Sequence, residues 1–164
     1  MEARNFQTAN EIIEDDNWLL PTLNGEPRYQ KPPLPTWITA LSILISNSKS
    51  IIFYRLPAII FLFVIGLTSY FFSIKIKLNK QESIINALIT ISSFYIIAII
   101  FEAPWDIFAH GFMFLGIYYL LENKLSNRQK ILAGIFIGLS IMSKGPISIY
   151  ALLIPFLFSY FLVY

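Results

Sequence analysis

Hydrophobic and polar positions divide this chain into two parts that meet near residue 50. In the first part, polar and apolar residues alternate over short distances. From Ile51 onward, apolar runs long enough to cross the hydrocarbon core of a membrane recur between short charged loops. The pattern predicts an all-α protein, with a polar module over residues 1–50 followed by a polytopic membrane helix bundle over residues 51–164.

The bundle is expected to contain about five apolar segments, since a helix needs roughly 20 apolar residues to span a bilayer. They lie at residues 52–74, 83–101, 107–121, 131–143 and 147–164. The first two are predicted to be full spans, and the third is shorter.

Two shorter helices are predicted in the polar module. Residues 3–14 form a weakly amphipathic helix that would lie in the membrane interface. Its expected apolar face consists of Ala3, Phe6, Ala9, Asn10 and Ile13. Residues 35–46 form a helix too short to span, placed at the interface or dipping into it. Between them, Asn24-Gly25 predicts a tight turn, because both residues tolerate positive φ.

Loop charge predicts the orientation of the bundle. Two short loops carry three cations each: Lys75, Lys77 and Lys80 in one, and Lys124, Arg128 and Lys130 in the other. Under the positive-inside rule both loops are cytoplasmic. Residues 1–50, residues 102–106 and residues 144–146 are then expected together on the outer side.

Composition supports a membrane protein and excludes other classes. The chain is 56% hydrophobic and 13% charged, and its mean hydropathy is +0.64, well above that of a soluble domain. It has no cysteine, which excludes disulfides and thiolate metal sites. The net charge of +2 is small and dispersed, which argues against nucleic acid as a partner.

The acidic candidates for chemistry lie near the third apolar segment. Asp106 is at the mouth of this segment, and His110 follows one turn further in on the same face. Ionisable residues at the membrane edge are costly and usually mark a functional site. The structural alternative is an acid that interacts with the positive end of the helix dipole, with His110 packed in the bundle. Glu102 is interpreted as a solvated loop acid, because Pro104 separates it from Asp106.

Three cations on the same side are candidates for anion binding. Lys31 lies between Gln30 and two prolines and could bind a headgroup or a phosphate. Lys144 precedes Gly145-Pro146, and Arg4 lies on the first amphipathic helix. Each could instead be a cation that extends toward the interface. Cations and acids on one membrane face suggest a lipid-phosphate substrate together with acid/base chemistry.

Short motifs of uncommon composition follow one another along the chain. They are Glu2-Ala3-Arg4, Asn17-Trp18-Leu19-Leu20-Pro21, Leu23-Asn24-Gly25-Glu26-Pro27, Lys31-Pro32-Pro33-Leu34 with Trp37, Arg55-Leu56-Pro57 and Ser143-Lys144-Gly145-Pro146. In this order they resemble the motifs of the membrane glycosyltransferases of the protein O-mannosyltransferase and lipid A aminoarabinose transferase superfamily. Asp106 occupies the position of the second acid of that family.

The resemblance implies a GT-C type fold, in which a large outer loop carries amphipathic juxtamembrane helices. It implies sugar transfer from a polyprenyl-phosphate donor to a glycolipid, such as lipid A, or to a protein. The reaction would take place at the outer face of the cytoplasmic membrane of a bacterium. The residues carried over by position are Glu2 and Asp106 as catalytic acids, Arg4, Lys31 and Lys144 as donor-phosphate cations, and Gln30, Glu102 and His110 as candidate supporting residues.

The chain departs from the family pattern at two positions. Met1 stands where the family has its usual catalytic Asp, and Gln30 replaces a common Glu. Because family members have further spans, the chain is expected to be a truncated piece, and a non-catalytic remnant is an alternative. A transporter or channel fragment with Asp106 and His110 as a proton relay is a third interpretation, but it does not explain the polar module. Glu2, Asp106 and His110 could assemble a divalent-metal site, although their spacing does not demand a metal or any other cofactor.

Overall fold

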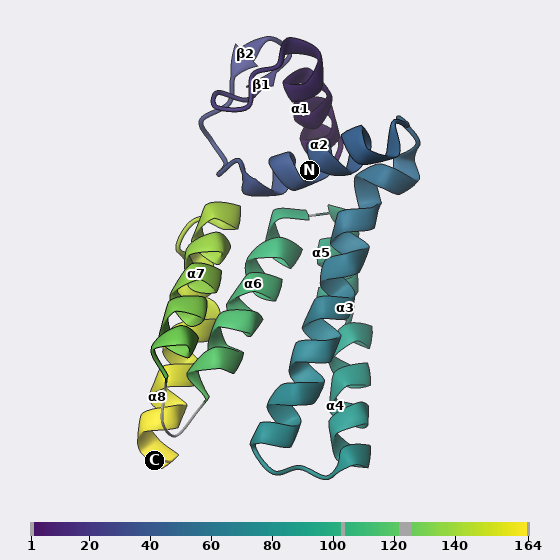
Figure 1. The fold of residues 1–164 in the computed structure, drawn as a ribbon. Coiled ribbons are helices and arrows are strands. Elements are labelled where there is room, and N and C mark those ends of the chain that lie inside the picture. Colours follow the sequence, from purple (N-terminus) through teal and green to yellow (C-terminus); the bar gives the residue numbers. More distant parts are fainter. Residues whose placement is uncertain (1, 103, 122–125, 164) are drawn as a thin grey trace.

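The computed structural model describes residues 2–102, 104–121 and 126–163, which are almost entirely helical. The elements in chain order are α1 (Glu2–Asp15), β1 (Thr22–Leu23), β2 (Glu26–Pro27), α2 (Leu34–Ser46), α3 (Ile51–Lys75), α4 (Lys80–Ser92), α5 (Phe94–Glu102), α6 (Pro104–Leu120), α7 (Asn127–Lys144), the π-helix η1 (Ile149–Leu153) and α8 (Ile154–Val163). Figure 1 shows α1, the hairpin and α2 as a cap over one end of the bundle formed by α3 to α8. The all-α class is confirmed.

The two helices of the cap pack through a buried polar contact. Asn5 of α1 donates from Nδ2 to Thr39 Oγ1 of α2 (2.9 Å) and accepts at Oδ1 from Thr36 Oγ1 (2.8 Å). The buried residues of α1 are Asn5, Thr8, Ala9 and Ile12. The predicted apolar face of this helix is therefore wrong in part: Ala9 is buried, but Ala3 is exposed. The hydrogen bonds to α2 turn Asn5 inward and rotate the helix away from the face expected from hydrophobicity.

A two-residue turn closes the loop between these helices. β1 and β2 pair antiparallel, and Asn24 (φ 57°) and Gly25 (φ 76°) adopt the positive φ predicted for them. The Glu11 carboxylate of α1 holds the turn, because it accepts hydrogen bonds from Asn24 N (2.7 Å), Gly25 N (3.3 Å) and Thr22 Oγ1 (2.6 Å). Burial raises the pKa of Glu11, but these hydrogen bonds outweigh burial, and the pKa is lowered overall.

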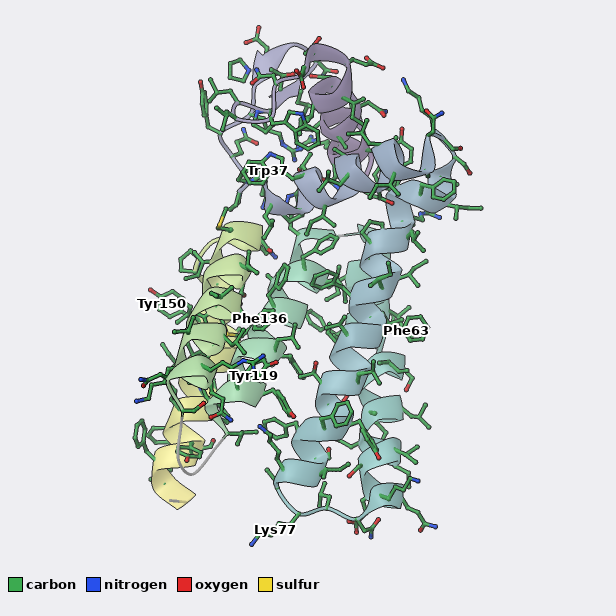
Figure 2. The ribbon with its side chains drawn as sticks, in the orientation of Figure 1. Trp37, Phe63, Lys77, Tyr119, Phe136 and Tyr150 are labelled. Atoms are coloured by element: carbon green, nitrogen blue, oxygen red, sulfur yellow. The ribbon has the colours of Figure 1, made fainter. Side chains whose placement is uncertain are left out.

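The apolar core of the bundle lies between α3, α5 and α6. Its buried members are Ala58, Ile65, Ile96, Ile99, Ile100, Ile107 and Phe108. α7 packs along α6, where the rings of Tyr119 and Phe136 stack with centroids 5.7 Å apart (Figure 2). Large apolar side chains such as Phe63 and Tyr150 are exposed on the outside of the helices. An apolar exterior of this kind suits contact with lipid.

The second predicted span, residues 83–101, contains a bend in the structure. It is divided into α4 and α5, which are bent by 50° relative to each other at Ser93. Ser93 is extended (φ −61°, ψ 136°), and its Oγ donates to the Thr90 carbonyl (3.0 Å). A serine hydroxyl that bonds to a carbonyl of the preceding turn competes with the helix ladder and favours a bend.

The polar features expected on one side of the membrane lie at one end of the bundle. The cap covers the end where α5 meets α6 and where α7 ends at Lys144 (Figure 1). Lys77 lies at the opposite end from Trp37 of the cap (Figure 2). Lys124 is outside the described residues. Which side of a membrane each end faces stays a prediction.

Length and composition identify fewer membrane crossings than the sequence pattern predicts. Among the described residues, α3 is the one single helix that is long and apolar enough to cross a bilayer. The bent pair α4 and α5 adds a second crossing if it counts as one span. The predicted multi-pass topology and the finer GT-C arrangement therefore stay predictions.

Candidate active site

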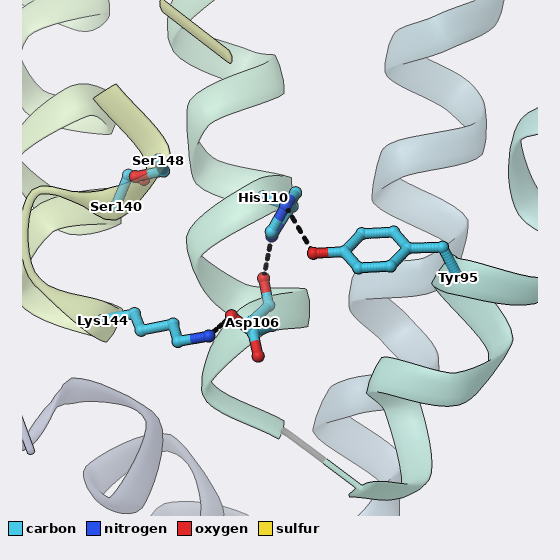
Figure 3. A network of polar contacts seen from close by, with 6 residues as sticks. All are labelled: Tyr95, Asp106, His110, Ser140, Lys144 and Ser148. Atoms are coloured by element: carbon cyan, nitrogen blue, oxygen red, sulfur yellow. Dashed lines mark hydrogen bonds and ion pairs between the residues drawn. The ribbon is translucent and has the colours of Figure 1, made fainter. Parts of the chain in front are cut away.

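An ion pair between Asp106 and Lys144 forms the centre of the candidate site (Figure 3). Asp106 lies in the first turn of α6 and is 6% exposed, while Lys144 is half-buried in the last turn of α7. Lys144 Nζ donates to Asp106 Oδ1 across 38 positions of sequence. The two residues meet because α6 and α7 pack side by side in opposite directions. The N-terminus of α6 also favours a carboxylate through the helix dipole.

The chain reversal after Lys144 is held against α6. Gly145 adopts φ 79° and ψ −164°, a conformation essentially restricted to glycine, and its N–H donates to the Ile141 carbonyl (2.7 Å). Ser140 Oγ donates to the Ala109 carbonyl of α6 (2.6 Å) and lies 2.6 Å from Ser148 Oγ. Both serines are buried. These contacts position the end of α7, and with it the ammonium group of Lys144.

His110 continues the polar contacts into the bundle. Its Nδ1 lies 2.6 Å from the main-chain oxygen of Asp106, which can only accept, so Nδ1 carries a proton. In the neutral ring Nε2 then accepts from the Tyr95 hydroxyl at 3.2 Å (Figure 3). His110 thus contacts the main chain of Asp106. A direct proton relay between the two side chains, as the transporter interpretation requires, has no support in this geometry.

Two cations of the cap lie near the ring of Trp105 in α6. Trp105 directly precedes Asp106 and is 1% exposed. The Arg28 guanidinium carbon lies 4.9 Å from the ring centroid, and Lys31 Nζ lies 6.0 Å from it. Both distances fall within the range of cation–π attraction, about 6 Å. Lys31 is therefore brought to the residue next to Asp106.

A pocket of about 350 Å³ opens in the loop beside the two cations. Its walls include Leu19, Leu20, Pro21, Arg28, Tyr29 and Lys31. A second pocket of about 420 Å³ lies between α2 and α3 and is lined almost entirely by apolar side chains. The loop pocket is the better candidate for a polar ligand, because charged groups line it.

The remaining predicted residues lie apart from the ion pair or on the surface. Glu2 accepts two hydrogen bonds from Arg55 at the head of α3, with Nε 2.7 Å from Oε1 and Nη2 3.0 Å from Oε2. Arg4 and Gln30 are exposed. The side chain of Glu102 is outside the described residues.

Glu2, Asp106 and His110 do not come together as one cluster in the structure. Within residues 2–102, 104–121 and 126–163, no three His, Cys, Asp or Glu side chains gather closely enough to hold a metal ion. Glu2 is bound to Arg55, and Asp106 is bound to Lys144. Glu2 and Asp106, the two candidate catalytic acids, therefore each have a cationic side chain as a partner.

Comparison with known families decides the classification. The profile of the family described as dolichyl-phosphate-mannose-protein mannosyltransferase matches residues 30–164, which is most of the chain. The chain belongs to this family. Lys31, Asp106 and Lys144 lie inside the matched region, whereas Glu2 and Arg4 lie outside it.

Two curated relatives of this mannosyltransferase family member are longer proteins. One is an undecaprenyl phosphate-alpha-4-amino-4-deoxy-L-arabinose arabinosyl transferase of Wigglesworthia glossinidia brevipalpis, 27% identical over 164 residues and 95% of this chain. The other is an uncharacterized protein of Aquifex aeolicus, 27% identical over 141 residues and 85% of this chain. The chain spans 28% of the length of each. No solved structure matches it.

Sequence reasoning missed three residues of the site: Arg28, Tyr95 and Trp105. A tryptophan at a predicted helix end is typical of an interfacial anchor, which concealed the role of Trp105 as a contact surface. The available signal for Arg28 was its position three residues before Lys31 on the same proline-rich segment. No local pattern indicated Tyr95, because its partner His110 lies on another helix.

Proposed function

We propose that this chain forms the catalytic end of a membrane glycosyltransferase. The enzyme would transfer a sugar from a polyprenyl-phosphate donor to a glycolipid, such as lipid A, or to a protein at the outer face of a bacterial cytoplasmic membrane. The observation that carries the proposal is the Asp106–Lys144 ion pair, with Lys31 on the adjacent Trp105 ring. Family membership and the name of the arabinosyl transferase relative support the same reaction class.

The proposed reaction forms a bond between an acceptor oxygen and the anomeric carbon of the sugar. The bond between that carbon and the donor phosphate oxygen breaks, and the polyprenyl phosphate leaves with the electron pair. Asp106 is the proposed general base and takes the proton of an acceptor hydroxyl. Lys31 and Lys144 stabilise the negative charge that develops on the leaving phosphate. Arg4 is a further cation candidate from the exposed side of α1.

The ion pair suggests an order of events. In the structure Lys144 neutralises Asp106, so a free carboxylate is not yet present. Binding of the donor phosphate would draw the ammonium group of Lys144 from the carboxylate to the phosphate. Asp106 would then be free to accept a proton. Glu2 is a second candidate base, and it would have to leave Arg55 before acting.

Transfer of a labelled sugar from a polyprenyl-phosphate donor, measured in membranes that contain the protein, tests this proposal. Asp106→Asn and Lys31→Ala should each lower the rate by about 100-fold, a typical loss for a general base or a charge-stabilising group. Lys49→Ala is the matched control, because Lys49 pairs with Glu14 on the exposed surface of the same cap. Unchanged transfer in both site variants contradicts the assigned roles. Ion flux without transfer would favour the transporter interpretation.

A further inference from the structure

We propose that Arg28, supported by the Trp105 ring, is a phosphate-binding residue of this site and holds the donor phosphate together with Lys31. The inference rests on the proposed function and adds two residues to it. Neither residue belongs to the motifs from which the candidate site was predicted.

The first argument is the position of the two cations. The Arg28 guanidinium and the Lys31 ammonium lie over the same indole ring, at 4.9 Å and 6.0 Å from its centroid. That ring belongs to the residue before Asp106, whose carboxylate is already paired with Lys144. Three cations thus gather near the N-terminus of α6, and among the described side chains the carboxylate found there, Asp106, is already neutralised by Lys144.

The second argument is that no carboxylate among the described residues pairs with Arg28. Its Nη1 donates to two neutral oxygens, Thr8 Oγ1 (2.8 Å) and the Arg4 carbonyl (3.2 Å). In the described part of the chain no carboxylate pairs with Arg28 or Lys31. Burial, followed by the nearby charge of Arg4, lowers the pKa of Arg28. The remaining N–H groups of a guanidinium fit two phosphate oxygens at once, which a lysine cannot do.

The third argument is an unsatisfied group on the ring itself. Trp105 Nε1 is buried and has no hydrogen-bond acceptor among the described residues. Buried donors are nearly always paired in native proteins, because an unpaired one loses its hydrogen bond to water without replacement. A phosphate oxygen held by Arg28 beside the ring would supply the missing acceptor.

The test must separate phosphate binding from a purely structural role. Arg28 also ties the loop to α1 through Thr8, so its removal can disturb the loop. Thr8→Val removes the same internal hydrogen bond and keeps the guanidinium, which makes it the matched control. The full chain in phosphatidylcholine nanodiscs is titrated with farnesyl phosphate and, separately, with farnesol, which has the same chain without the phosphate.

Arg28→Ala should weaken the affinity for farnesyl phosphate by about tenfold, as expected for loss of a charge-assisted contact, and leave the affinity for farnesol unchanged. Arg28→Lys should lie between Arg28→Ala and the wild type. Trp105→Phe keeps a ring but removes the N–H, and it should weaken farnesyl phosphate binding by about threefold, since Trp is the strongest cation–π partner. Thr8→Val should bind both ligands like the wild type.

Several outcomes overturn the inference, and they can be told apart from failure of the proposed function. If Thr8→Val weakens binding as much as Arg28→Ala, or if farnesol binding falls in parallel, Arg28 acts only through the loop. If Lys31→Ala weakens phosphate binding and Arg28→Ala does not, the inference fails and the proposed function stands. If neither variant changes binding, the proposed donor site itself is wrong. Equal competition by phosphatidylglycerol would show a general headgroup site instead of a donor site.

Discussion

Replacing Lys144 with methionine tests the ion pair on which the candidate site depends. Methionine keeps much of the aliphatic side chain and removes the ammonium group beside Asp106. The Asp106 side chain is 9% exposed and that of Lys144 is 22% exposed, so water shields this pair only weakly. Removal of one partner from a buried pair costs about 3 kcal/mol, because the other charge is left buried and unpaired. At roughly 2–4 °C per kcal/mol for a chain of this size, the expected decrease in Tm is about 6–12 °C.

The assay is thermal unfolding of the protein in nanodiscs, with Asp106→Asn and the double variant measured beside Lys144→Met. The double variant removes both charges, so its loss of stability should be smaller than the sum of the single losses by about 1–3 kcal/mol. Lys77→Met, at the opposite end of the bundle, should unfold like the wild type. Strictly additive losses from Asp106 and Lys144 would show that the two side chains do not interact, and would refute the reasoning.

Three further predictions concern the turn held by Glu11, the glycine at the end of α7 and the orientation of the bundle in the membrane. The lowered pKa of Glu11 means that its contribution to stability is present above its ordinary pKa of 4.5 and is lost as the pH falls through the lower folded value. The difference in Tm between wild type and Glu11→Gln should therefore be present at neutral pH and close toward about pH 3. Gly145→Ala should lower stability by about 1–3 kcal/mol, because φ 79° with ψ −164° suits glycine alone. Gly138→Ala, inside α7 with open space at its Cβ, should instead be neutral or stabilising by about 0.5–1 kcal/mol, and chemical denaturation distinguishes the two. The chain has no cysteine, so a single introduced cysteine can be labelled specifically. Lys31→Cys should react with an impermeant thiol reagent only from outside, and Lys77→Cys only from the cytoplasm. Labelling of position 31 only from the cytoplasm would contradict the predicted orientation.

Turns and helices that depend on residues adjacent in the chain were predictable from the sequence. The Asn24-Gly25 turn was predicted because both residues tolerate positive φ, and both adopt it. The helix at 35–46 corresponds closely to α2, because its apolar run stops at polar residues. The apolar face of α1 was wrong in part, since hydrophobicity alone gave no weight to Asn5. The bend within the second predicted span was not predicted, since apolar composition alone does not reveal the hydrogen bond of Ser93.

The sequence by itself determined the helical class, the division into a polar module and apolar helices, and the motifs that contain Lys31, Asp106 and Lys144. These properties follow from composition and from spacing over a few residues. Only the tertiary structure decided which charges meet: Lys144 with Asp106, and Glu2 with Arg55. Each pair joins residues 38 or more positions apart, so its formation depends on how whole helices pack. Burial then sets the strength of each contact, because a charge taken out of water is stabilised only by the partner that packing brings to it.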